Sequence, residues 1–455
     1  MHRRPLAFLL VAAALAALAL PNRTLANEPA AIHTIAQSDL LGHIEFLASE
    51  ELEGRGLGEK GGRIAQRYLA SYYQRLGLEP AGEDGTYFQE FVARGKNGRN
   101  VLAKLPGTDP TLRDECIVIA GHVDHLGRGR GGDGPVYNGA DDNASGTASI
   151  LELAEAFTAA RPRRSIIFFN TDGEESGLLG SRHWLQNPTF PVESIVTLFC
   201  MDMIGRSENG YLFVGGLGTS PTFPELVNGL NERFRFELET ADGGNVPTDS
   251  AGFYKKECPV LFFFTNMHDD YHRPTDDIFK LNLEGLEKIT QMIFLASHDV
   301  ANRDERPTFT KNDSMAMPKD FMTRMRDRMM RSRESAAYLG VGPDPDADGE
   351  GFVIGTVSDG APSAKAGLQP GDRILAIADM PVEGMAGLRR ALAAKKPGDT
   401  VSIKLVRGNE TLELPCELGS MAQMMSGGRN RDRGDRNEKD QDDQDKEGSG
   451  GKDPR

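Results

Sequence analysis

Short runs of consecutive apolar residues recur through the middle of the chain, with helical patterns between them. The runs are Cys116–Ala120, Ser165–Phe169, Ile195–Phe199 and Val260–Phe264. None alternates apolar with polar residues, as a half-exposed strand would, so each predicts a strand buried on both faces of its sheet. The stretches Ser145–Ala159 and Leu283–Ala301 have helical patterns. Strands alternating with helices predict an α/β sandwich.

Further changes of pattern predict the domain organisation. Two amphipathic helices are expected between Ile35 and Leu76, separated by the glycine-rich segment Gly54–Gly58. We expect a signal peptide at 1–26, a catalytic domain at 27–305, a linker helix at 306–337, a small mainly-β domain at 338–418 and a disordered charged tail at 419–455. The basic amphipathic linker could lie on a membrane, but packing on a neighbouring domain is the simpler interpretation.

The N-terminus has the features of an export signal. Basic residues at 2–4 precede the apolar run Leu6–Leu20, and small residues follow, so cleavage is expected after Ala26. The run is shorter than the ~20 residues that span a bilayer, and no other segment is long and apolar enough. The sequence therefore predicts an exported protein, periplasmic or secreted, with no stable membrane span.

Charge and cysteine content narrow the function classes. The formal net charge of the 455 residues is −15, which argues against nucleic acid as a partner, because phosphate recognition needs cationic surface. The four cysteines are widely spaced and do not describe a disulfide framework. Cys116 and Cys200 lie within or at the end of strand-like runs, and we expect them to be buried core residues.

Metal-ligating residue types follow the predicted strands. In open α/β sheets, ligands bind beyond the carboxyl ends of the strands, where like charges repel unless a cation lies among them. The residues at these places are His122 and Asp124, Glu174 and Glu175, Asp202, His272, and the pair Asp141–Asp142 before a helix. Histidines and carboxylates suit zinc, and a shared carboxylate can bridge two ions. The sequence therefore predicts a metal site at one edge of the sheet.

Five segments carry a closer resemblance. They are GHVDHLG (121–127), NGADDNASGTASILELA (138–154), NTDGEESGLLGS (170–181), MDMIGR (201–206) and HDDYHRPTDD (268–277). In order and spacing they resemble the motifs of M28 metallopeptidases, from about Ile35 to Asn302. The resemblance implies the zinc-aminopeptidase fold, a phosphorylase/hydrolase-like α/β/α sandwich around a mixed sheet.

The same resemblance implies a ligand set for two zinc ions per chain. His122 and Asp202 would hold one ion, Glu175 and His272 the other, and Asp141 would bridge them. The peptide between Asp141 and its neighbour Asp142 would be cis. His125 and His268 would have supporting or structural roles.

Further roles follow from the resemblance motif by motif. Glu174 would be the general base that forms a metal-bridging hydroxide. Asp124 would accept the second imidazole N–H of His122 and fix its orientation. Tyr271 would donate a hydrogen bond to the developing oxyanion, or else be a packed structural residue. The sequence 248–250 reads Thr-Asp-Ser where relatives often carry Ser-Asp-His, which puts the substrate pocket in doubt.

The C-terminal part resembles a bacterial PDZ domain. The stretch SDGAPSAKAGLQPGDRILAI (358–377) carries this resemblance, which covers about 338–418. It implies a peptide-binding loop at Leu339, Gly340 and Val341, whose backbone N–H groups could receive a C-terminal carboxylate. A purely structural packing module is the alternative.

The expected function is therefore an exported two-zinc metallopeptidase that hydrolyses N-terminal peptide bonds. Peptide or protein N-termini would be its substrates, and a C-terminal peptide a possible ligand of the PDZ-like domain. The alternatives are a peptide-binding PDZ scaffold with a dead peptidase domain, or glutaminyl cyclase, carboxypeptidase or dipeptidase activity on the same fold.

Overall fold

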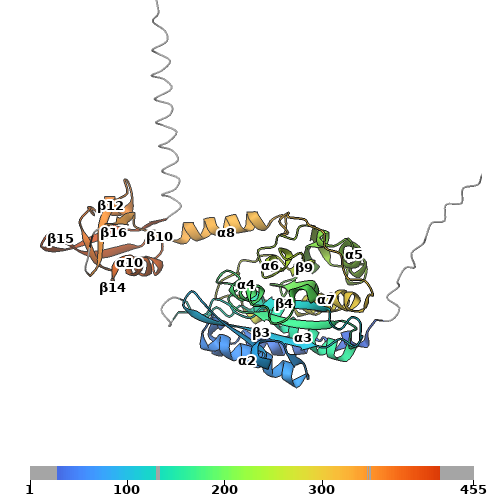
Figure 1. The fold of residues 1–455 in the computed structure, drawn as a ribbon. Helices are drawn as coiled ribbons and strands as arrows, with labels where there is room; N and C mark the ends of the chain where they lie inside the picture. Colours follow the sequence, from blue (N-terminus) through green and yellow to red (C-terminus); the bar gives the residue numbers. More distant parts are fainter. Residues whose placement is uncertain (1–27, 130–133, 346, 348–349, 421–455) are drawn as a thin grey trace, which may run out of the picture. The chain divides into compact units, whose positions relative to one another are not determined.

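The computed structural model describes residues 28–129, 134–345, 347 and 350–420, and the chain divides into two compact units at Lys319 and Asp320 (Figure 1). Each unit is considered by itself. The expected signal peptide and most of the expected tail lie outside the described residues. Among the described residues, no helix combines the length and the apolar character needed to cross a membrane.

The first unit is built on a mixed sheet whose central strands are parallel. Its strand order is β1-β3-β5-β4-β6-β9-β7-β8, with β2 paired to β3, and the pairs β5–β4, β4–β6, β6–β9 and β7–β8 are parallel. The strands are β1 (Glu79–Pro80), β2 (Phe88–Ala93), β3 (Lys96–Leu105), β4 (Cys116–His122), β5 (Ser165–Thr171), β6 (Ile195–Met201), β7 (Tyr211–Gly215), β8 (Glu237–Ala241) and β9 (Val260–Phe264).

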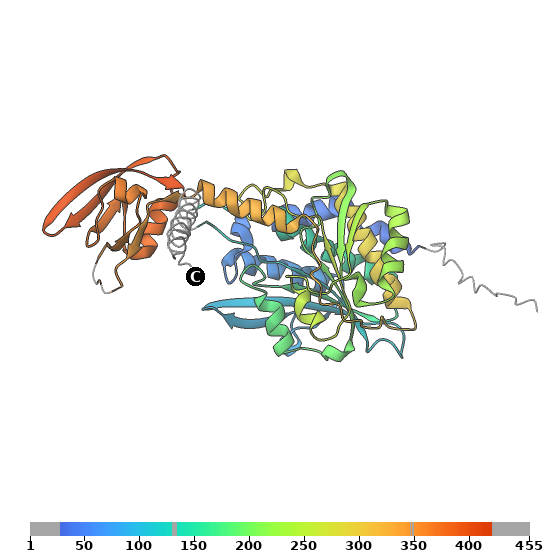
Figure 2. The same cartoon turned by 90° about the horizontal axis from the view of Figure 1, so that it is seen from above.

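Helices cover both faces of this sheet, as the uninterrupted apolar strands predict. The helices are α1 (Gln37–Leu47), α2 (Lys60–Arg75), α3 (Gly146–Ala160), α4 (Leu179–Gln186), α5 (Phe223–Phe234), α6 (Ser250–Tyr254) and α7 (Leu283–Asn302). Neighbouring residues of β5 show the two layers. Phe168 contacts Phe157 of α3, whereas Phe169 contacts Trp184 of α4 and Phe253 of α6. The predicted α/β/α sandwich is confirmed, and Figure 2 shows the same layers from above.

The second unit begins with α8 (Phe321–Ser335), so the predicted linker helix is shorter than 306–337. The residues before α8 belong to the first unit instead, since Thr310 N–H donates to Thr219 O and Ala316 is fully buried. The mainly-β part has the sheet order β11-β12-β13-β15-β16, with β14 paired to β13, and β10 pairs with β17. Its elements are β10 (Ala337–Tyr338), β11 (Val341–Pro343), β12 (Phe352–Val357), α9 (Pro362–Lys365), β13 (Arg373–Ile377), β14 (Met380–Pro381), α10 (Gly384–Ala393), β15 (Thr400–Arg407), β16 (Glu410–Glu417) and β17 (Gly419–Ser420).

All four cysteines are buried and free. Cys116 is the first residue of β4 and Cys200 lies in β6, in the centre of the sheet. The expectation that both are core residues is confirmed.

Candidate metal centre

Parallel strands bring the candidate residues to one edge of the sheet. Strand β4 ends at His122, β5 ends just before the loop with Glu174 and Glu175, and β6 ends just before Asp202. Because the three strands are parallel, their carboxyl ends meet at the same edge. His272 reaches the same place from the loop after β9, where its backbone has a φ of 53°. The predicted convergence of imidazole and carboxylate groups is thus present.

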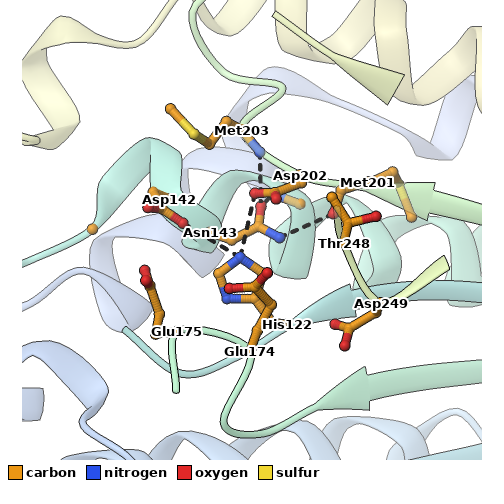
Figure 3. Close-up of polar contacts among 12 residues, drawn as sticks. His122, Asp142, Asn143, Glu174, Glu175, Met201, Asp202, Met203, Thr248 and Asp249 are labelled. Atoms are coloured by element: carbon orange, nitrogen blue, oxygen red, sulfur yellow. Dashed lines mark hydrogen bonds and ion pairs between the residues drawn. The ribbon is translucent and has the colours of Figure 1, made fainter. Parts of the chain in front are cut away.

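A first group of potential metal ligands lies around the imidazole of His122 (Figure 3). Its Nε2 atom lies 3.3 Å from Asp142 Oδ1 and 3.3 Å from Asp202 Oδ1. Ligand atoms of these three residues are close enough to share one cation. His122 and Asp142 are buried, so the group is largely withdrawn from water.

A second group lies on the other side of the Asp142 carboxylate. His272 Nε2 is 2.9 Å from Glu175 Oε2 and 3.2 Å from Asp142 Oδ2. His125 Nδ1 is 2.8 Å from Glu175 Oε1 and 3.7 Å from Asp142 Oδ2. Each carboxylate oxygen of Glu175 therefore lies next to one histidine. The two oxygens of Asp142 are divided between the groups, since Oδ1 faces the first group and Oδ2 faces the second.

The shared carboxylate corrects the sequence-based assignment of Asp141. Both oxygens of Asp141 are engaged elsewhere: Oδ1 accepts from Gly205 N–H at 2.7 Å, and Oδ2 lies 3.1 Å from His268 Nε2. The prediction that Asp141 lies between the two groups is wrong, because its neighbour Asp142 occupies that place. The cis peptide was expected between Asp141 and Asp142, but it lies one residue further along the chain, between Asp142 and Asn143.

Charge pairing within the two groups shifts several pKa values. Burial alone would lower the pKa of His122, but Asp202 and Asp142 raise it well above its ordinary range. Burial would raise the pKa of Asp142, yet the surrounding histidines, His125 first, hold it well below its ordinary value. The protein itself thus favours an ionised carboxylate at the point where both groups meet.

The donor geometry fits zinc. In a tetrahedral site with bonds of about 2.0–2.1 Å, neighbouring ligand atoms lie roughly 3.3–3.4 Å apart. The nitrogen–oxygen separations of 3.3, 3.3 and 3.2 Å around Asp142 are close to that value. Among the described residues, neither Asp142 Oδ2 nor His272 Nε2 has a hydrogen bond of acceptable geometry, although these two buried atoms are 3.2 Å apart. Two facing polar atoms left in this way are what a shared cation would satisfy.

In the described part of the chain, two sets of residues have ligand atoms close enough to share a cation, and Glu174 is in neither: His122, Asp142 and Asp202 form one set, and His125, Asp142 and Glu175 form the other. Its backbone N–H donates to Asp124 Oδ1 at 3.1 Å, which ties the loop after β5 to the loop after β4. Burial raises the pKa of the Glu174 carboxyl well above its ordinary value, opposed by His122 and supported by Asp202. A partly exposed carboxylate of raised pKa next to a ligand cluster suits a proton carrier.

Asp124 contacts His122 differently from the prediction. The imidazole Nδ1 lies 3.0 Å from the backbone carbonyl oxygen of Asp124 and 3.8 Å from its carboxylate Oδ1. The nearer acceptor is therefore the carbonyl. An Nδ1–H that donates to this carbonyl leaves Nε2 free to face Asp142 and Asp202.

The remaining candidates lie around this core. The Tyr271 ring stacks on that of His272 with centroids 3.8 Å apart, and burial, followed by the carboxylates of Asp142 and Glu175, raises its phenol pKa. In segment 248–250, Thr248 Oγ1 and Ser250 Oγ are 3.0 Å apart, and the Asp249 carboxylate accepts from the Thr171 hydroxyl.

One supporting residue was missed by sequence reasoning although it lies in a quoted motif. The buried Asp276 carboxylate accepts the backbone N–H groups of Asp141 and Asp142, with Oδ2 at 3.1 and 3.0 Å. Arg206 Nη2 lies 3.4 Å from Asp276 Oδ1. Asp276 therefore holds the backbone that presents Asp142, a role that only the folded loop reveals.

In the second unit, the predicted peptide-binding residues lie at the start of the sheet. Leu339 is buried in the core, and Gly340, with a φ of 88°, accepts from the hydroxyl of Ser363 through its carbonyl. Val341 begins β11, which lies at the edge of the described sheet. An edge strand has one side available to a further strand.

Comparison with known proteins tests the two resemblances expected from the sequence. Residues 100–297 match the model of peptidase family M28, and residues 337–418 match that of the PDZ domain. The chain therefore has a region similar to peptidase family M28, followed by a region similar to the PDZ domain. Both expected resemblances are thereby confirmed.

Curated relatives match about half of this chain or less. Leupeptin-inactivating enzyme 1 of Streptomyces exfoliatus is 28% identical over 50% of this chain and 48% of its own length. Aminopeptidase YwaD of Bacillus subtilis is 27% identical over 45% and 46%, and a probable zinc metalloprotease of Pyrenophora teres is 29% identical over 38% of each chain. The chain thus spans about half or less of the length of these relatives.

Proposed function

We propose that the protein is an exported metallopeptidase with two zinc ions that removes N-terminal amino acids from peptides. The observation that carries this proposal is the shared Asp142 carboxylate between two imidazole–carboxylate groups. His122, Asp142 and Asp202 would hold one ion, and Asp142, Glu175 and His272 the other. His125 would orient Glu175 through its 2.8 Å contact with Oε1. The zinc-related names of the relatives support the choice of metal.

The chain's own residues then divide the work. When bound, the two ions would polarise the peptide carbonyl and make the attacking water more acidic. The Glu174 carboxylate would accept a proton from the attacking water and pass it to the nitrogen of the leaving amine. The hydrogen bond from its backbone N–H to Asp124 ties its loop to the loop that follows His122. Tyr271, stacked on His272, is the proposed donor to the developing oxyanion.

Neighbouring glutamates provide a matched test of these roles. Glu174→Gln should retain zinc but lose at least ~10²-fold in turnover of aminoacyl-4-nitroanilides, since a general base contributes about 10²–10⁴-fold. Glu175→Gln should lose zinc from the second group. Zinc content and turnover are measured on the same purified samples. Turnover by Glu174→Gln at the wild-type rate would contradict the general-base role. A wild-type protein that hydrolyses only N-terminally blocked substrates would contradict the aminopeptidase assignment.

The remaining parts of the proposal concern location and the PDZ domain. Export is inferred from residues 1–26, and N-terminal sequencing of the mature protein should find Asn27 first. Binding of a C-terminal peptide is supported by the edge position of β11, which follows Leu339 and Gly340 directly.

A further inference from the structure

Arg55 is buried, and each side-chain hydrogen bond that the structure gives it goes to a backbone carbonyl oxygen. It ends the short helical segment η2 (Glu50–Arg55), and only 1% of its surface is exposed. Its guanidinium donates to four carbonyl oxygens: Leu47 at 2.5 Å, Asn138 at 2.7 Å, Val123 at 2.9 Å and Gly139 at 2.9 Å. Arginines this deeply buried usually have a carboxylate partner, so the arrangement calls for a reason.

The carbonyl partners lie next to proposed zinc ligands. Val123 directly follows His122, and the carbonyls of 138 and 139 belong to the loop that enters η4 (Ala140–Ser145), which carries Asp142. One guanidinium therefore joins the loop after β4 to the loop before α3. Because four acceptors fix the plane and position of the fork, the separation of the two loops is fixed as well.

The backbone around Arg55 strengthens this junction. The carbonyl of Arg55 accepts from His125 N–H at 3.3 Å, and that of Gly54 accepts from Gly127 N–H at 3.0 Å. Gly54 has a φ of 74°, and a Cβ there would lie 2.5 Å from the carbonyl oxygens of Gly127 and Tyr137. The segment thus enters between the two loops so closely that a side chain at 54 does not fit.

The charge of Arg55 also acts on the site. Burial lowers the pKa of its guanidinium to about 10, while the carboxylates of Asp142, Asp124 and Asp276 oppose that shift. The group is therefore cationic at neutral pH and lies within the field of the carboxylate cluster. A fixed positive charge there reduces the repulsion among carboxylates that must be ionised to bind metal.

We propose that Arg55 is a positioning residue of the zinc site, which sets the distance between His122 and Asp142 by joining their loops. This inference rests on the proposed two-zinc function. Lysine cannot replace arginine in the role, because an ammonium has three donors on one atom and cannot reach four carbonyls arranged around a planar fork.

Arg164 provides a matched control at the other end of the sheet. It is also 1% exposed and donates to the carbonyls of Val300 at 3.0 Å and Asp304 at 3.1 Å, besides pairing with Glu115. It immediately precedes β5, whose far end leads to Glu174. Arg164→Lys therefore disturbs an equally buried arginine without touching the ligand loops.

The test measures zinc affinity of the full chain by competition with a chromophoric chelator, beside thermal unfolding of the zinc-free protein. Arg55→Lys should weaken zinc binding about 10- to 100-fold, as loss of groups that orient metal ligands does. Arg164→Lys should lower the unfolding temperature but leave zinc affinity within about twofold, since distant sites act independently. Wild-type zinc affinity in folded Arg55→Lys would overturn the inference.

A milder variant covers the case in which Arg55→Lys does not fold. Asn138 Nδ2 donates to Ala48 O at 2.8 Å and to Glu50 Oε1 at 3.2 Å, so it ties the same loop to the same N-terminal segment without a buried charge. Asn138→Ala should then also weaken zinc binding, and unchanged affinity would overturn the inference. Absence of zinc binding in the wild type would instead refute the proposed function, and this inference with it.

Discussion

The structure places Asp142, and not Asp141, between the two groups of proposed zinc ligands, and this leads to a sharp prediction. Asp142→Asn and Asp141→Asn remove one carboxylate oxygen each from adjacent residues. In the structure, Asp142 lies within 3.3 Å of His122 Nε2 and 3.2 Å of His272 Nε2. We therefore expect Asp142→Asn to weaken both zinc sites and Asp141→Asn to leave both occupied.

The magnitude follows from the number of ligands. Zinc binding to a four-ligand structural site releases about 10–16 kcal/mol, roughly 2.5–4 kcal/mol per ligand, which corresponds to about 10²–10³-fold in affinity. Asp142→Asn should cost each site about that factor. Asp141→Asn instead weakens charge-assisted hydrogen bonds to Gly205 N–H and His268, each worth about 1.5–3 kcal/mol of folding stability.

The assay combines zinc content after gel filtration with urea unfolding of the zinc-free proteins. Asp142→Asn should elute largely without zinc, whereas Asp141→Asn should retain zinc and lose folding stability through its two weakened hydrogen bonds. The reverse pattern, with zinc lost from Asp141→Asn and retained by Asp142→Asn, would refute the assignment.

Two further predictions concern the second unit. Removing 320–455 should leave turnover of aminoacyl-4-nitroanilides within about twofold, because the two units form separate compact bodies; a folded truncation without activity would contradict this. In the PDZ domain, burial tends to raise the pKa of Asp372, but hydrogen bonds from Arg407 lower it overall. A lowered carboxyl pKa contributes stability that is present above the unfolded pKa and is lost as pH falls through the folded value. The stability of the wild-type protein, followed by circular dichroism, should thus decline below pH about 4, and that of Asp372→Asn should decline less. An equal decline in the two proteins would contradict this prediction.

The centre of the fold could be predicted from sequence, whereas its edges could not. Strands such as β5 are uninterrupted apolar runs because helices cover both faces, and this pattern survives in the sequence alone. Strand β8 reads Glu-Leu-Glu-Thr-Ala and has no such pattern. It is a strand because it pairs in parallel with β7, and that long-range contact leaves no local signal.

The site shows the same division. Residues at or just beyond the carboxyl ends of buried parallel strands, such as His122 and Asp202, could be found because these ends meet at one edge of the sheet. The choice between Asp141 and Asp142 could not, since adjacent carboxylates point in directions set by the loop backbone. Arg55 gave no signal either, because its partners are carbonyl oxygens from distant segments, and every residue has a carbonyl.

The central claim is that two zinc ions share the Asp142 carboxylate, and anomalous diffraction at the zinc edge tests it most directly. Crystals of the zinc-loaded protein should show two peaks about 3.5–4 Å apart, one on each side of Asp142. One peak should lie beside His122 and Asp202, and the other beside Glu175 and His272. A single peak, or peaks placed around Asp141, would contradict the account.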